Sequence, residues 1–120
     1  MKRLIYILIP ILLFSCKSKA ELAMERGIRL YDWNKLDEAL TEFSTVRYLL
    51  SYDKNLSIES IELLAQAYFN LGITYAKMEL YSQAEKEILE AISLLPNKEY
   101  RDVLRLVRAK MIPASTSSNK

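Results

Sequence analysis

Three neighbouring carboxylates, Glu85, Glu87 and Glu90, are the residues best placed for acid–base chemistry. Two close carboxylates can divide the roles of general acid and general base. These three, however, fall on the predicted exposed face of a helix, where water would solvate them. The sequence has no histidine and a single cysteine, Cys16, so it lacks the commonest proton shuttle and any metal site built from several Cys or His ligands. We therefore expect no enzyme activity, no metal and no cofactor.

Length and charge set further limits. A chain of 120 residues, 51% of them hydrophobic, is enough for one domain with one modest core. The net charge of +2 comes from 17 basic and 15 acidic residues, and two of the basic residues are Lys2 and Arg3. Because the rest of the chain is balanced at 15 against 15, nothing in the overall charge favours nucleic acid as a partner.

The N-terminus has the layout of a secretory signal peptide over residues 1–15. Two cations precede an apolar run from Leu4 to Phe14, and a small residue precedes Cys16. The alternative is a transmembrane anchor, but eleven residues interrupted by Pro10 fall short of the roughly 20 that a membrane-spanning helix needs.

The stretch "LFSC" resembles the lipobox of bacterial lipoproteins. The resemblance implies cleavage before Cys16 and acylation of this cysteine, for instance with palmitate, so that the mature protein would be tethered to a membrane without crossing it. Lys17 stands where an aspartate would signal retention in the inner membrane. The resemblance therefore favours the periplasmic face of the outer membrane.

The two glycines of the chain indicate an internal repeat. Gly27 and Gly72 lie 45 residues apart, and an isoleucine follows each of them. The same shift superimposes Ala39 on Ala84 and also aligns Glu42 with Glu87, Phe43 with Ile88 and Val46 with Ala91. A glycine on one helix and an alanine on the next would let two backbones approach closely, which offsets the roughly 1 kcal/mol that glycine costs in a helix.

These positions resemble the tetratricopeptide repeat, a 34-residue helix–turn–helix unit. In the second copy the consensus places are occupied by Tyr68, Leu71, Gly72, Tyr75, Ala84, Ile88, Ala91 and Pro96. In the first copy Gly27, Leu30, Ala39 and Phe43 fit. The resemblance implies an all-α fold of about two hairpins; the alternative is an ordinary helical hairpin with unrelated glycines.

The pattern predicts five helices, at about 19–32, 35–51, 57–78, 81–95 and 98–112. Ser57 and Asn97 are the predicted N-caps of the third and fifth. The 11-residue excess of the 45-residue shift over a 34-residue repeat equals about three helical turns, so we expect a long third helix. An apolar stripe in the last helix (Tyr100, Leu104, Val107 and Met111) should cover the open end of the stack. The folded domain thus runs over 16–112, and 113–120 should be a disordered tail.

Two surfaces could bind a partner. The repeat resemblance implies a concave groove lined by Met24, Ile28, Tyr31, Phe69, Ile73 and Lys77, which would suit an apolar peptide or helix. The alternative is that neighbouring helices cover these residues. The second surface is a basic row in the last helix, made of Lys98, Arg101, Arg105 and Arg108. This row is either a solvated face or a contact for an acidic partner or anionic headgroups.

The lipobox and the repeats together are similar to lipoproteins that assemble complexes in the bacterial envelope. The layout looks like the BamD-type component of the outer-membrane barrel assembly machinery, which docks on the barrel-inserting protein. We expect an adaptor that binds one or more envelope proteins and does not bind nucleic acid. The alternatives are a pilotin-like or other complex-assembly lipoprotein, and a structural subunit that self-associates.

Overall fold

The computed structural model describes residues 17–112, and this part of the chain is entirely helical outside its turns. Five helices follow one another: α2 (Lys19–Asp32), α3 (Leu36–Ser51), α4 (Ile58–Lys77), α5 (Tyr81–Leu94) and α6 (Lys98–Met111). The all-α prediction is confirmed, and each predicted helix boundary lies within one residue of the observed one. The predicted signal peptide, Cys16 and the predicted tail lie outside the described residues.

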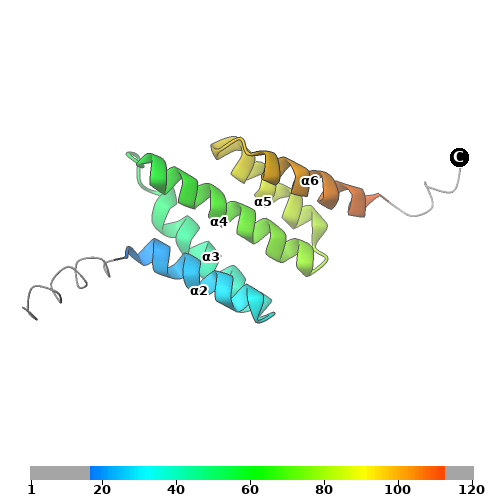
Figure 1. Cartoon of the computed structure of the whole chain (residues 1–120), viewed down its shortest axis with the longest axis horizontal. Helices are drawn as coiled ribbons and strands as arrows, with labels where there is room; N and C mark the ends of the chain where they lie inside the picture. Colours follow the sequence, from blue (N-terminus) through cyan, green and yellow to red (C-terminus); the bar gives the residue numbers. More distant parts are fainter. Residues whose placement is uncertain (1–16, 113–120) are drawn as a thin grey trace, which may run out of the picture.

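The helices form two hairpins and a fifth helix, arranged in two layers. The hairpins are α2–α3 and α4–α5, and α6 packs against α5. Figure 1 shows α2, α4 and α6 in one layer, with α3 and α5 behind them. Contacts between these helices show how they run. Lys77 lies over Tyr31, so α4 and α2 meet at their C-terminal ends. Phe69 of α4 stacks on Tyr100 near the start of α6, whereas Lys77 at the end of α4 lines the same cleft as Lys110 at the end of α6. The three front helices therefore run parallel.

Polar side chains cap the N-termini of three of these helices. Ser57 accepts a hydrogen bond from the Ser60 N–H at the start of α4, and Asn97 accepts one from the Glu99 N–H at the start of α6, so both predicted N-caps are confirmed. At α2, Ser18 and Glu21 form a capping box. Each cap satisfies N–H groups that have no partner within the helix.

The first hairpin turns at a residue in the left-handed conformation. Asn34 has φ of 61°, and its N–H donates to the carbonyl of Tyr31 over 2.9 Å. The Lys35 N–H then donates to the carbonyl of Leu30 over 2.8 Å. These two bonds define a Schellman motif, which ends α2 and turns the chain into α3.

The second hairpin repeats this turn 45 residues later. Glu79 has φ of 63°, its N–H donates to Ala76 over 3.0 Å, and the Leu80 N–H donates to Tyr75 over 2.9 Å. The internal repeat is therefore present in the backbone as well as in the sequence. Asparagine tolerates the left-handed region better than most residues do, whereas glutamate does so at a cost.

The two glycines lie where the paired helices pack in close contact. A Cβ atom built on Gly27 would lie 2.5 Å from Cε1 of Phe43, and one built on Gly72 would lie 2.5 Å from Cγ1 of Ile88 and 3.2 Å from the carbonyl oxygen of Ala84. No real side chain fits at these distances. In both hairpins, therefore, a large apolar side chain of the second helix packs directly against a glycine of the first.

Helix α4 is the centre of the stack because it contributes to two hydrophobic clusters. Ala67 and Leu71 pack with buried residues of α2 and α3, whereas Ala65 and Phe69 pack with buried residues of α5 and α6. A helix that is apolar on two sides can join two hairpins into one core. None of the helices between residues 17 and 112 is both long and apolar enough to cross a membrane.

The extra length of the repeat lies mostly in helix, as predicted. Helix α4 has 20 residues against 14 in α2, and α3 has 16 against 14 in α5. The remainder lies in the connection between α3 and α4, residues 52–57, which is longer than the connection 95–97 between α5 and α6. The long third helix of the prediction is therefore correct, and a longer loop accompanies it.

Most predicted packing residues are buried. The fully or almost fully buried ones are Gly27, Ala39, Phe43, Leu71, Gly72, Ala84, Ile88 and Ala91. Tyr68 and Tyr75 are half-buried, and Pro96 is exposed in the connection that follows α5. The prediction that Met111 belongs to the buried stripe of α6 is wrong. This residue is 41% exposed, because it is the last residue of the helix.

Candidate functional site

The structure divides the predicted groove residues. Met24 and Phe69 are 4% and 8% exposed and were wrongly placed on an open surface. Met24 lies in the core between the hairpins, where its sulfur accepts a hydrogen bond from the Asn70 side chain at 3.3 Å. Phe69 stacks on Tyr100 with ring centroids 4.5 Å apart. Helix α6 covers most of Phe69, so this ring mainly stabilises the fold.

Three other groove residues, Tyr31, Ile73 and Lys77, do come together in a cleft of about 470 Å³. It lies where the C-terminal ends of α2, α4 and α6 meet the start of α5. Its remaining lining residues are Ala76, Tyr81, Val103, Leu106, Val107 and Lys110. The sixth predicted residue, Ile28, is 38% exposed but does not line this cleft.

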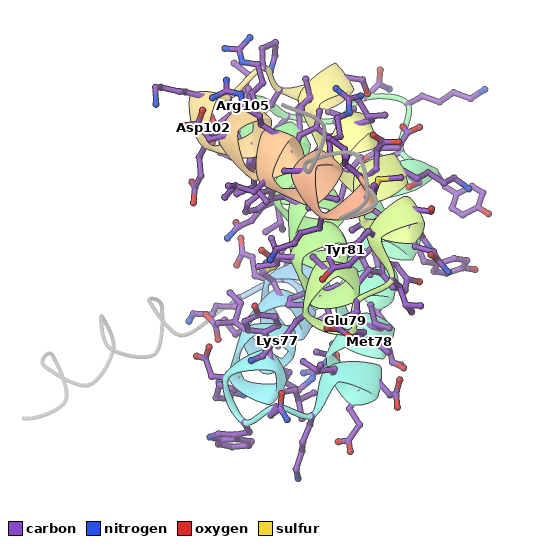
Figure 2. All side chains as sticks on the ribbon, turned by 90° about the vertical axis from the view of Figure 1, so that its right-hand side faces the viewer. Lys77, Met78, Glu79, Tyr81, Asp102 and Arg105 are labelled. Atoms are coloured by element: carbon purple, nitrogen blue, oxygen red, sulfur yellow. The ribbon has the colours of Figure 1, made fainter. Side chains whose placement is uncertain are left out.

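Lys77 is positioned at the rim of this cleft by an aromatic neighbour. Its Nζ lies 4.5 Å from the centroid of the Tyr31 ring, a geometry in which the ring face attracts a cation. Figure 2 shows Lys77 at the end of α4 and, after a short connection, Tyr81 at the start of α5. The cleft therefore combines an apolar floor with a cation held at one edge.

A second cleft, of about 420 Å³, continues along α4 towards its N-terminus. It shares Ile73 with the first cleft, and its other lining residues are Glu62, Gln66, Phe69, Asn70, Leu95, Asn97, Glu99 and Tyr100. Burial raises the pKa of Tyr100, and the nearby Glu99 and Glu62 carboxylates raise it further. We call the two clefts together the α4–α6 groove.

The basic row of α6 is not a uniform basic surface. Asp102 lies among its members, 2.8 Å from Nζ of Lys98 and 3.7 Å from the Arg105 guanidinium, and Figure 2 shows Asp102 and Arg105 side by side. These neighbours lower the pKa of Asp102, with the Lys98 hydrogen bond the largest cause. Arg108 instead reaches α5 and pairs with Glu85 at 2.6 Å. The row therefore mostly makes ion pairs within the chain, and Arg101 is exposed.

Of the three carboxylates Glu85, Glu87 and Glu90, the first two form ion pairs with other helices. Glu87 was expected on an exposed face, but its side chain is only 12% exposed and lies 3.5 Å from Arg47 of α3. Burial raises the pKa of Glu87, while Arg47 acts in the opposite direction. Arg47 also lies 5.9 Å from the centroid of the Tyr68 ring. Arg47 of the first hairpin thus contacts both helices of the second hairpin, α4 and α5.

The sequence patterns did not identify most of the groove residues. Tyr81, Val103, Leu106 and Lys110 come from helices that were assigned only to packing or to the basic row. The signal that could have identified them is the spacing of Val103, Leu106 and Lys110 at three and four residues, which places them on one face of the last helix.

Within residues 17–112, no group of three or more His, Cys, Asp or Glu side chains is arranged to hold a metal ion. No protein-family model matches the sequence, and comparison with curated proteins finds no significant match. The groove and the sequence patterns are therefore the features that bear on function.

Proposed function

We propose that this protein is a non-enzymatic, lipid-anchored adaptor of the bacterial cell envelope that binds a protein partner through the α4–α6 groove. The groove itself carries the proposal. It is a partly apolar surface that crosses several helices of one stack, and Leu106 on its rim is 67% exposed. Exposed apolar side chains grouped in a groove with a polar rim are typical of protein-binding surfaces.

We propose further that the two hairpins are tetratricopeptide-like repeats, and their shared geometry supports this. The two hairpins share their turn geometry, with Asn34 and Glu79 in equivalent left-handed positions. They also share the packing of a glycine against a large apolar residue. Proteins built from such repeats use the layer formed by the first helix of each repeat to bind peptides and helices. The α4–α6 groove lies in that layer.

The anchor is tested independently of the groove. We expect Cys16→Ala to abolish incorporation of a radiolabelled fatty acid, because the proposed acylation site is the only cysteine in the chain. The control is Ser15→Ala, which keeps a small residue before the cysteine. Label retained on the Cys16→Ala protein would remove the lipoprotein part of the proposal.

The adaptor role is tested by crosslinking the tagged protein in its native membrane and identifying the co-purified chains. A barrel assembly protein of the outer membrane would support a BamD-like role. Recovery of a secretin would instead indicate a pilotin-like role, and recovery of this chain alone would indicate a structural subunit. The groove variant Leu106→Ala should reduce recovery of the partner, whereas Tyr48→Ala, at an exposed position on α3, should not.

A further inference from the structure

The charged residues of the α4–α6 groove are sorted by sign. The cleft at the C-terminal ends of α4 and α6 contains two charged residues, Lys77 and Lys110, both basic. The cleft at the N-terminal ends also contains two, Glu62 and Glu99, both acidic. Among the described residues, none of these four side chains takes part in an ion pair. The groove therefore has an acidic end, an apolar middle and a basic end.

The parallel packing of the front layer explains this polarity. Acidic residues stabilise the first turn of a helix and basic residues the last turn, because they complement the helix dipole. Glu99 lies in the first turn of α6 and Lys110 in its last, and Lys77 lies in the last turn of α4. Since α4 and α6 run in the same direction, their like charges gather at the same ends of the groove.

The groove has the length of a short helix. Glu62 and Lys77 are 15 residues apart on α4, which corresponds to about 22 Å at 1.5 Å per residue. A guest helix of about four turns would span this distance. An extended guest would find few partners for its backbone here, because the N–H and C=O groups in the middle of the surrounding helices are already paired within those helices.

We infer that the partner segment is an amphipathic helix that binds antiparallel to α4, with its acidic first turn at Lys77 and Lys110 and its basic last turn at Glu62 and Glu99. This inference rests on the proposed adaptor function and specifies the partner's chemistry. A guest helix with the usual distribution of charge, acidic at its start and basic at its end, is complementary to the groove only in this direction.

A second copy of this chain fits less well. Helix α6 has the required charges, with Glu99 in its first turn and Arg108 and Lys110 in its last. Its main apolar face is, however, already buried in its own core, where Leu104 and Val107 are 7% and 3% exposed. The apolar face of the guest must therefore come from another protein.

The test is site-specific photo-crosslinking in the native membrane, with benzoylphenylalanine at Gln66 near the acidic end and at Leu106 near the basic end. Both residues are exposed and uncharged, so the substitutions leave the four charges in place. Mass spectrometry of the crosslinked peptides should place both contacts in one helix of the partner. Gln66 should contact its basic C-terminal end, and Leu106 should contact its acidic N-terminal end.

Charge reversal tests the role of each end. Glu62→Lys with Glu99→Lys should lower the crosslinking yield about tenfold, as should Lys77→Glu with Lys110→Glu. The matched controls are Glu38→Lys with Glu90→Lys and Lys35→Glu with Lys86→Glu, which reverse exposed charges outside the groove and should leave the yield within twofold of wild type. Circular dichroism of each variant establishes that the helices are retained.

The possible outcomes separate this inference from the proposed function. A guest helix in the opposite direction, an uncharged guest, a second copy of this chain or unchanged yields after charge reversal would each overturn the inference. Crosslinks to a partner from a probe at Tyr48 on α3 but not from Gln66 or Leu106 would overturn it while leaving the adaptor role in place. If no probe position captures any protein, the adaptor function fails, and the inference fails with it.

Discussion

At the residue scale, each hairpin depends on a glycine, because a Cβ atom at that position would overlap the facing side chain. We expect Gly27→Ala to destabilise the fold by about 1–3 kcal/mol, because the added Cβ would overlap the Phe43 ring. This outweighs the roughly 1 kcal/mol that alanine gains over glycine in a helix. In chemical denaturation of the single and double variants, Phe43→Leu should reduce the cost of Gly27→Ala, since leucine lacks the two ring atoms at 2.5 and 3.1 Å. Additive effects of the two substitutions would contradict the proposed contact.

Glu87 provides a second test at this scale, through pH. Burial raises its pKa above the ordinary value of 4.5. The unfolded chain has the ordinary pKa and the folded protein the raised one. At a pH between the two, the folded state binds more protons than the unfolded state, so this group makes stability fall as pH rises through 4.5 towards the folded pKa. Glu87→Gln removes that dependence. We expect the melting temperature of the variant, relative to wild type, to increase between pH 4 and pH 7. Glu38→Gln, at an exposed position on α3, serves as the control, and a relative decrease for Glu87→Gln would show that its ion pair with Arg47 dominates.

At the scale of the elements, the two hairpin turns differ in how well their residues suit the backbone. Glu79 occupies a left-handed position that favours glycine. Glu79→Gly should therefore stabilise the protein by about 1 kcal/mol in thermal unfolding, and Asn34→Gly should have a smaller effect because asparagine tolerates this conformation. The control, Lys86→Gly on the exposed face of α5, should cost about 1 kcal/mol. A destabilising Glu79→Gly would mean that the turn depends on the glutamate side chain.

These elements also show how far the sequence could predict the structure. Helix boundaries were predictable because they depend on local signals, such as the caps at Ser57 and Asn97. The left-handed turn at Glu79 was not predicted, because glutamate gives no sign of that conformation. Glu87 was placed on an exposed face for a related reason. Its burial depends on contact between α3 and α5, which no pattern within α5 reveals.

At the scale of the whole molecule, the groove was the least predictable feature, because it depends on where α6 docks. The repeat pattern pointed to Tyr31, Ile73 and Lys77, which line the groove. It could not show that α6 would cover Phe69 and leave Leu106 exposed. Both are apolar residues at helical spacing, and only the docked position of α6 distinguishes a core residue from a surface residue.

Phe69, which was predicted to line an open groove but is mostly buried, and Leu106, which is exposed on the rim of the groove, should therefore respond differently to substitution. Phe69→Ala removes a ring that is 8% exposed and stacked on Tyr100, so it should cost about 3–5 kcal/mol and loosen α6. Hydrogen exchange should then accelerate in α6 more than in α2. Leu106→Ala removes a side chain that is 67% exposed, so it should change stability by less than about 0.5 kcal/mol while weakening partner binding. If Phe69→Ala instead left both stability and exchange in α6 unchanged, α6 would not dock through this ring, and the α4–α6 groove would lose one of its walls.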